Sequence, residues 1–248
     1  MTPGVSVARS ASELVDDNRR FYDALWGSAR VVDPKRFNTW PLVQSLLPTA
    51  RRRLEVAPGL RPHLPLDGTR FVDISTAALA KLSSRGAQVA QGDVTALPFP
   101  DRSFDLVCAL DIIEHVDDDE AALAELARVA DDGAVMIVSV PLYAAHWTKF
   151  DEFVGHKRRF EPAELAAKLA RHRIGIERSA VFGMAPKSSR VQDFGMWWLV
   201  NHRDHAMKFY NRLFMPLGLL FQKPLKFEPG FVAKGGVDEV LLVARKLS

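Results

Sequence analysis

The segment GDVTALPFPDRSFDLVCALDIIEHV, residues 92–116, contains the most specific pattern in this sequence. Its apolar run at 104–110 has the length and composition of a buried strand. Asp93 precedes this run, and Asp111, Glu114 and His115 follow it. Ligands of open α/β sheets bind beyond the carboxyl ends of the strands. The segment therefore predicts a central strand and one side of a binding site.

Similar runs lie on both sides of this segment. Six further strands are predicted, at 52–57, 70–74, 88–92, 134–140, 173–182 and 237–245. Helical spacing predicts helices at 11–27, 75–84, 118–130 and 161–171. The alternation indicates an α/β fold with three layers, in which helices cover both faces of a mainly parallel, seven-stranded sheet.

Two regions interrupt the alternation, the first 50 residues and the stretch 183–235. We expect one domain, 1–248, with its α/β core at 51–182 and 236–248. Residues 1–50 are expected to form a helical segment before the core. Residues 183–235 are expected to form a helical insertion before the last strand.

Composition excludes few functions. A chain of 248 residues with 48% hydrophobic content can bury a large core. A formal net charge of +3 does not indicate a nucleic-acid partner. The single cysteine, Cys108, has no partner for an intrachain disulfide. The sequence has no signal-peptide core and no run of 18 apolar residues, so we expect a cytoplasmic protein.

An acid lies at or just after each of the first four predicted strands: Glu55, Asp73, Asp93 and Asp111. Each has a structural alternative, since Asp73 could cap the next helix and Asp93 could stabilise a turn. Caps and turns do not require an acid at every one of four successive strands. Their joint placement therefore favours a binding site.

The order of RRRLEVAPGL, FVDIS, GDVTALPFPDRSFDLVCALDIIEHV, LAELARVADDGAVMIVSVP and GHKRRFEPAEL resembles the S-adenosylmethionine-dependent methyltransferases with the seven-stranded Rossmann-like fold. The resemblance covers residues 50–182 and the last strand. It implies S-adenosyl-L-methionine as cofactor, with Asp73 on the ribose hydroxyls and Asp93 and Val94 on the adenine. The cofactor-binding residues that it implies are Glu55, Ala57, Gly59, Asp73, Ile74, Asp93, Val94, Leu110 and Asp111.

The loop after the first strand departs from the family pattern. The family has alternating glycines after its acid, whereas Ala57, Gly59 and Arg61 stand at these positions. Three prolines of the same loop oppose the helix that usually follows: Pro58, Pro62 and Pro65. We expect that helix to be shortened or lost, with Gly59 keeping the closest backbone approach.

Two alternatives to methyl transfer remain. A nicotinamide-dependent oxidoreductase would need G-x-G-x-x-G to receive a pyrophosphate, and APGLRP lacks this spacing. A catalytically silent module could retain the fold for cofactor binding or interaction. Cofactor binding followed by methyl turnover separates these hypotheses.

His115 and His156 are the candidate catalytic residues, and Tyr143 and His146 the candidate substrate contacts near the strand ends. A structural hydrogen-bonding role is the alternative for each histidine. In some related quinone and RNA methyltransferases, an acidic and histidine cluster at the position of Asp111, Glu114 and His115 holds a divalent metal. We expect this chain to act without a metal.

In similar enzymes the N-terminal segment covers the cofactor cleft as a lid. Here Tyr22 and Trp40 are candidate substrate contacts, with Phe37 and Asn38 also on the lid, and simple packing on the sheet is the alternative. From 187 to 226, seven Lys or Arg stand against two Asp, interleaved with aromatic residues. A packed helix, an acceptor lid, a dimer contact and membrane attachment remain open here; peripheral membrane contact is not favoured.

Together these features predict methyl transfer from S-adenosyl-L-methionine to a small-molecule or lipid-like acceptor, with oxygen favoured over nitrogen or carbon. No nucleic-acid partner is expected.

Overall fold

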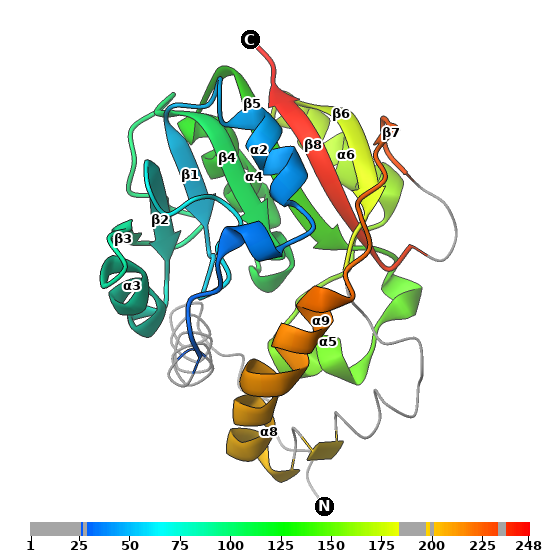
Figure 1. The fold of residues 1–248 in the computed structure, drawn as a ribbon. Coiled ribbons are helices and arrows are strands. Elements are labelled where there is room, and N and C mark those ends of the chain that lie inside the picture. The colour runs from blue at the N-terminus through cyan, green and yellow to red at the C-terminus, as the bar shows by residue number, and fades with distance from the viewer. Residues whose placement is uncertain (1–25, 27–28, 184–196, 199–200, 233–236) are drawn as a thin grey trace, which may run out of the picture.

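An eight-stranded sheet forms the centre of the computed structural model, in the order β3-β2-β1-β4-β5-β8-β6-β7 (Figure 1). The structure describes residues 26, 29–183, 197–198, 201–232 and 237–248. The strands are β1 (Arg53–Val56), β2 (Thr69–Asp73), β3 (Gln88–Gln91), β4 (Phe104–Leu110), β5 (Ala130–Pro141), β6 (Ile174–Val181), β7 (Glu228–Pro229) and β8 (Glu239–Lys246).

The sheet is mixed. Strands β1 to β5 pair in parallel, whereas β8 is antiparallel to both β5 and β6, and β7 is antiparallel to β6. All seven predicted strands are present, but the predicted number of seven is wrong. The eighth, β7, is only two residues long, and so short a segment has no periodic pattern from which to predict it.

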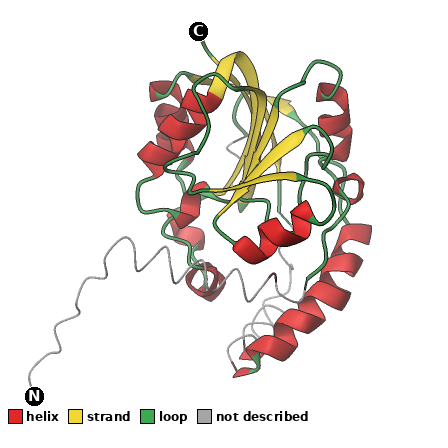
Figure 2. Cartoon of the chain, turned by 90° about the vertical axis from the view of Figure 1, so that its left-hand side faces the viewer, coloured by secondary structure: helices red, strands yellow, loops and turns green. Residues whose placement is uncertain are grey.

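Helices cover both faces of the sheet, which gives the three predicted layers. Three predicted helices are present as α3 (Thr76–Ser83), α4 (Asp119–Val129) and α6 (Pro162–Arg171). In Figure 1, α2 (Trp40–Leu46) lies in front of the sheet and α4 and α6 lie behind it, and Figure 2 shows helices on the two sides. The helix predicted at 11–27 lies outside the described residues, apart from Trp26.

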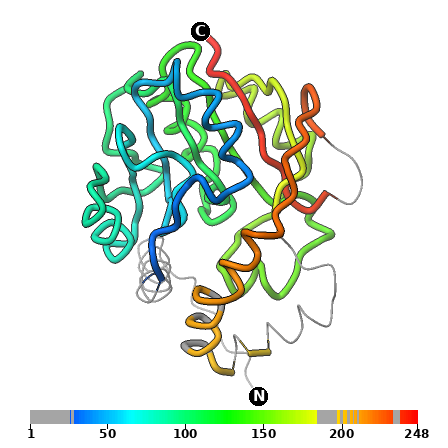
Figure 3. Tube along the Cα trace, in the orientation of Figure 1, coloured from blue at the N-terminus to red at the C-terminus, as the bar shows by residue number. Residues whose placement is uncertain are grey.

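The remaining described helices are short. They are α5 (Lys149–Val154), α8 (Arg203–Phe209) and α9 (Met215–Leu220), with a π-helical turn at Tyr210–Phe214 and 3-10 turns at Pro34–Arg36, Ile113–His115 and Ala144–His146. The stretch from α8 to α9 lies within the predicted insertion. The tube of Figure 3 shows it as one extended segment below the sheet. None of the described helices is long and apolar enough to cross a membrane.

Alternating side chains of β4 build the core on both faces. Val107 and Ala109 belong to the buried cluster that includes Leu123 of α4, whereas Leu106 and Cys108 belong to the cluster that includes Val43 of α2. This period of two is that of a strand covered on both sides. The continuous apolar run at 104–110 thus has its physical explanation in β4.

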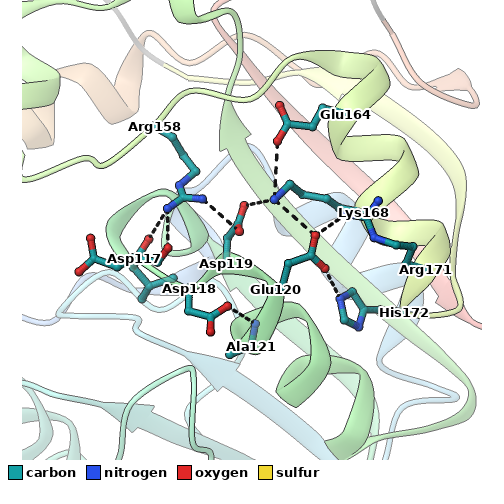
Figure 4. A network of polar contacts seen from close by, with 11 residues as sticks. Asp117, Asp118, Asp119, Glu120, Ala121, Arg158, Glu164, Lys168, Arg171 and His172 are labelled. Carbon is teal, nitrogen blue, oxygen red and sulfur yellow. Dashed lines mark hydrogen bonds and ion pairs between the residues drawn. The ribbon is translucent and has the colours of Figure 1, made fainter. Parts of the chain in front are cut away.

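A polar network fixes α6 and the loop before it to the start of α4 (Figure 4). Nζ of Lys168 lies 2.7 Å from Oδ2 of Asp119, and Nη1 of Arg158 lies 3.0 Å from Oδ1 of the same carboxylate. Lys168 and Asp119 are both buried, so each charge needs the other. The network therefore holds the 155–160 loop beside the first turn of α4.

The loop between β1 and β2 contains no helix, as the prolines predict. The buried carboxylate of Glu55 replaces it as an organiser, because its two oxygens accept hydrogen bonds from the backbone N–H groups of His63 and Leu64, each at 2.8 Å. Burial raises the pKa of Glu55 to about 8, although the two backbone N–H groups lower it.

Trp26 covers the same loop at Gly59. The backbone of Gly59 has a φ of 52°, and a Cβ at this position would clash with the indole ring of Trp26. The guanidinium carbon of Arg61 lies 5.3 Å from the centroid of the Trp26 ring, and Nζ of Lys81 donates hydrogen bonds to the carbonyls of Trp26 and Ala29. The loop therefore lies between β2 and the segment at Trp26 and Ala29.

Glu55→Gln should change the pH dependence of stability. The raised pKa means that the native state holds a proton that the unfolded state has lost, so this contribution to stability is present at low pH and disappears as pH rises from about 4.5 to about 8. Relative to the variant, the wild type should lose a few kcal/mol of unfolding free energy between about pH 5 and pH 8. Urea denaturation measures this, with the exposed Glu152→Gln as control. Parallel pH profiles of wild type and Glu55→Gln would contradict it.

Gly59→Ala should destabilise the fold mainly through Trp26. We expect a loss of roughly 2–4 kcal/mol, from the steric clash together with the strain of alanine at positive φ. In a Trp26→Ala background only the strain remains, about 1 kcal/mol. Denaturation of the four proteins of this double-mutant cycle gives the coupling energy. Strictly additive effects would show that Trp26 does not pack on Gly59.

Candidate functional site

The strand order reverses between β1 and β4, because β2 and β3 follow on one side and β5 on the other. This is the position at which open α/β sheets bind ligands, beyond the carboxyl ends of the strands. The predicted residues after β1 to β4 meet at this edge. It faces downward in Figure 1, opposite the C-terminus, where antiparallel β8 ends.

Asp73, the last residue of β2, joins two neighbouring loops. Its Oδ2 accepts a hydrogen bond from the N–H of Gly59 at 2.9 Å, and its Oδ1 accepts one from the N–H of Ser75 at 2.8 Å. Ser75 in turn caps α3 by accepting a hydrogen bond from the N–H of Ala78. Each carboxylate oxygen has two acceptor positions, so the geometry fits a ribose hydroxyl at Asp73.

Asp93 and Val94 offer an acceptor beside a donor. Oδ1 of Asp93 accepts hydrogen bonds from the N–H and hydroxyl of Thr95, at 2.8 and 2.6 Å. Within the described part of the chain, no donor reaches Oδ2 of Asp93 and no acceptor reaches the N–H of Val94. Adenine presents an amine donor next to a ring-nitrogen acceptor, so these two groups fit the adenine of the expected cofactor.

A second acid, missed in the sequence, joins Asp111 beyond β4. The Oδ1 of Asp111 accepts a hydrogen bond from the hydroxyl of Ser139 at 2.6 Å, and Glu239 lies close enough for the two carboxyls to affect each other's pKa. Antiparallel β8 brings Glu239 opposite Pro141 at the end of β5. No local pattern marks Glu239, because its position depends on strand order.

Asp111 and Glu239 share their environment. Burial raises the pKa of both carboxyls, and the neighbouring Asp111 raises that of Glu239 further. Two neighbouring carboxyls in such an environment oppose each other's ionisation, so the charge of one affects the titration of the other. Taken as a whole residue, Asp111 is nevertheless exposed to solvent.

Glu114, His115 and His156 form a buried group behind this pair. Among the described residues, neither carboxylate oxygen of Glu114 has a hydrogen-bond partner, although Nε2 of His156 lies 3.8 Å from its Oε1. Burial, with Asp111 nearby, raises the pKa of Glu114 well above its usual value. Burial, together with His156, lowers the pKa of His115 to about 3, and burial lowers the pKa of His156 as well. One ligand atom from each of the three residues lies within 4.8 Å of the others, a spacing that a metal ion would permit.

The 155–160 loop places His156. Nδ1 of His156 lies 2.8 Å from Oδ1 of Asp151, and Nε of Arg159 lies 2.9 Å from the same oxygen. Burial raises the pKa of Asp151, but its bonds from Arg159 and Thr148 bring it down to about 2. The pKa of Asp151 therefore lies below its usual value, and that of Glu114, without such donors, lies well above it.

The structure separates the predicted substrate residues. Tyr143, with a φ of 61°, and His146 lie together after β5, with ring centroids 5.2 Å apart. Trp40 packs within α2 against the cluster on the sheet face, as its packing alternative states. Tyr22 lies outside the described residues.

The other predicted cofactor residues occupy strand ends. Ile74 follows β2 directly, and Leu110 is the last residue of β4; both are half-buried. Ala57 follows β1 with a φ of 54° and donates its N–H to the carbonyl of Val72. The oxygens of Glu55 bind the loop amides described above. Trp26 lies over this part of the site. It was not identified from the sequence, because an aromatic residue in a predicted helix cannot be distinguished from an ordinary core residue.

Comparison with known sequences identifies the domain. Residues 67–138 match the methyltransferase domain family. An uncharacterized methyltransferase of Bacillus subtilis, YcgJ, is 31% identical over 108 residues, which are 43% of this chain and 42% of the relative. A demethylmenaquinone methyltransferase of Mycolicibacterium paratuberculosis is 36% identical over 85 residues, 33% of this chain and 37% of the relative. The chain thus spans less than half the length of these relatives.

Solved structures share the whole fold. A possible histamine N-methyltransferase of Thermotoga maritima superimposes with a TM-score of 0.56 at 20% identity, covering 95% of this chain and 93% of that one. The [4+2]-cyclase SpnF superimposes with a TM-score of 0.59 at 16% identity, covering 99% of both chains. Since one of these proteins is a cyclase, the fold by itself does not fix the reaction. Residues 67–138 thus match a methyltransferase domain, and the chain as a whole has the Rossmann-like fold of these solved structures.

Proposed function

We propose that this chain transfers the methyl group of S-adenosyl-L-methionine to a small-molecule or lipid-like acceptor, at oxygen. The observation that carries the proposal is that Oδ2 of Asp93 and the N–H of Val94 have no partner among the described residues, one strand away from the carboxylate of Asp73. The cofactor would supply an electrophilic methyl group on its sulfonium. The chain would hold the adenosine at these residues and the methionyl part near Gly59.

Positioning would supply much of the rate. A methyl sulfonium is reactive enough that a nucleophile held in line with it needs little further activation. The loop of Ala57 and Gly59 is held by Glu55, Asp73 and Trp26, so its backbone is preorganised for one ligand position. This rigidity supports a site that orients the cofactor before the acceptor arrives.

An oxygen acceptor must also lose a proton. The Asp111 and Glu239 carboxyls are suitable recipients, because burial raises the pKa of both and a carboxylate with a raised pKa is a stronger base. His115 and His156 remain the predicted catalytic residues. Their burial and lowered pKa values favour neutral imidazoles. His115 would act as an organiser of the 111–116 segment or as an acceptor contact.

The relatives are named for different acceptor molecules. They include a demethylmenaquinone methyltransferase and an ajmaline N-methyltransferase of Rauvolfia serpentina. A lipid-like acceptor agrees with the apolar side chains that the α8–α9 segment exposes near the candidate site. A silent binding module with the same fold would bind the cofactor without turning it over.

Asp93→Asn should weaken cofactor binding. The side-chain amide of asparagine has one acceptor oxygen and one donor nitrogen, so one of the two contacts is lost in either orientation. The nitrogen would face either the donors of Thr95 or the exocyclic amine of adenine. We expect S-adenosylhomocysteine affinity to fall about tenfold to hundredfold, which corresponds to roughly 1.5–3 kcal/mol. Calorimetric titration measures it, and the exposed Asp67→Asn is the matched control. Wild-type affinity in a folded Asp93→Asn protein would remove the adenine contact from the proposal.

His115→Ala should separate turnover from cofactor binding. We expect turnover to fall at least tenfold, about 1.4 kcal/mol or more in activation free energy, while S-adenosylhomocysteine affinity stays within a few fold. The assay follows S-adenosylhomocysteine release with a catechol, a quinol and phosphatidylethanolamine as acceptors. The control is His172→Ala, whose ring binds Glu120 in the network of Figure 4.

A chelator distinguishes the metal alternative in the same assay. Turnover should survive exhaustive chelation. Activity that is lost with chelator and restored by magnesium would assign a metal to Glu114, His115 and His156. Undiminished turnover in His115→Ala would leave that histidine structural. Cofactor binding with no turnover of any acceptor would favour the silent module.

A further inference from the structure

The stretch 203–221, here called the rod, carries an apolar face that the protein leaves exposed. It runs through α8, the π-helical turn and α9, and ends at Phe221. Leu220 and Phe221 are the most exposed of its apolar side chains, at 71% and 81%. The exposed set is Phe209, Leu213, Phe214, Leu217, Leu220 and Phe221, whose spacing of three, four and seven residues places them on one helical face.

The opposite face of the rod is fixed to the protein. Met215 and Leu219 are buried in a cluster with Phe37. Just beyond the rod, the side chain of Gln222 accepts a hydrogen bond from the N–H of Asn38 at 2.9 Å and donates one to the carbonyl of Arg36 at 3.1 Å. The rod therefore packs on the protein through one face, and its exposed phenylalanines and leucines lie on the other.

Positive charge accompanies the apolar face. Residues 205–227 contain four cations, Lys208, Arg212, Lys223 and Lys226, and no Asp or Glu. Subtracting this +4 from the net charge of +3 leaves −1 on the rest of the chain. Lys208, Arg212 and Lys223 are exposed. An apolar face with exposed cations beside it is the pattern of a helix that lies in the interface of an anionic bilayer.

A second copy of the chain fits the rod less well. A symmetric dimer built on this face would bring the same basic segment against itself, and the like charges would oppose association. An anionic lipid surface satisfies both features, because acyl chains receive the apolar side chains and headgroups receive the cations. We propose that the rod docks this protein on an anionic membrane surface, lying along the interface without crossing it.

Docking through the rod would place the candidate site at the membrane. The rod lies beyond the carboxyl ends of the parallel strands, below the sheet in Figures 1 and 3. Nη2 of Arg61, in the loop after β1, lies 3.4 Å from Oδ1 of Asn211 within the rod. The edge that carries Asp73 and Asp93 would thus open close to the lipid surface. The docking surface itself requires no catalytic activity.

Vesicle sedimentation of the full chain tests the proposal. The wild type should sediment with phosphatidylcholine vesicles that contain about one-third phosphatidylglycerol, and not with pure phosphatidylcholine, and added salt should weaken binding. The double variant Leu220→Ser/Phe221→Ser should bind at least tenfold more weakly. Lys208→Gln/Arg212→Gln should also bind several-fold more weakly. The matched control is Leu247→Ser, a 49% exposed leucine after β8, which should bind like the wild type.

Three results would overturn the proposal. They are no binding of the wild type to anionic vesicles, undiminished binding by the Leu220→Ser/Phe221→Ser protein, and equal binding to neutral and anionic vesicles. Sedimentation velocity supplies a further outcome: a wild-type dimer that the same double variant converts to monomers would assign the face to a second copy. Circular dichroism confirms that each variant is folded.

Discussion

The buried carboxylate of Asp73 is the interaction on which the candidate site at the strand ends depends. It accepts one hydrogen bond from the loop after β1 and one from the start of α3, so two segments that approach the ligand edge share one anchor. A buried anion of this kind is stable only when donors surround it. Glu55 fixes the far end of the same loop, which has no helix of its own. The backbone around Gly59 is thereby held from both ends.

Local patterns predict the sheet but only part of the site. Strands such as β4 can be predicted because each is a short apolar run. Ser75 is the N-cap that its position before 76–83 predicts. Asp73 and Asp93 follow from the rule that ligands bind at strand ends, together with the family resemblance. Glu239 could not be predicted in this way, since its contact with Asp111 joins residues far apart in the chain through an antiparallel strand. The position of Trp26 over Gly59 could not be predicted for a similar reason, because this contact leaves no pattern in the local sequence.

Neighbouring groups, rather than residue type, decide which acids near β4 are ionised. Asp151 receives hydrogen bonds from Arg159 and Thr148, and its pKa falls to about 2 despite burial. Glu114 is just as deeply buried but lacks such partners, and its pKa rises well above its usual value. One small region therefore contains a carboxyl with a lowered pKa beside carboxyls with raised pKa values. The difference lies in the donors, since Arg159 of the 155–160 loop contacts Asp151.

The pairing of Val181 with Val240 has a consequence for how such a protein can change over evolution. The N–H of Phe182 donates to the carbonyl of Glu239, so the two ends of the stretch between β6 and β8 are already neighbours in the sheet. The entropy of closing a loop grows only slowly with its length. A longer or shorter stretch can therefore replace this one without a change in the register of β6 and β8. A sheet with this property can accept a different segment between β6 and β8 while the loops at Asp73 and Asp93 stay the same.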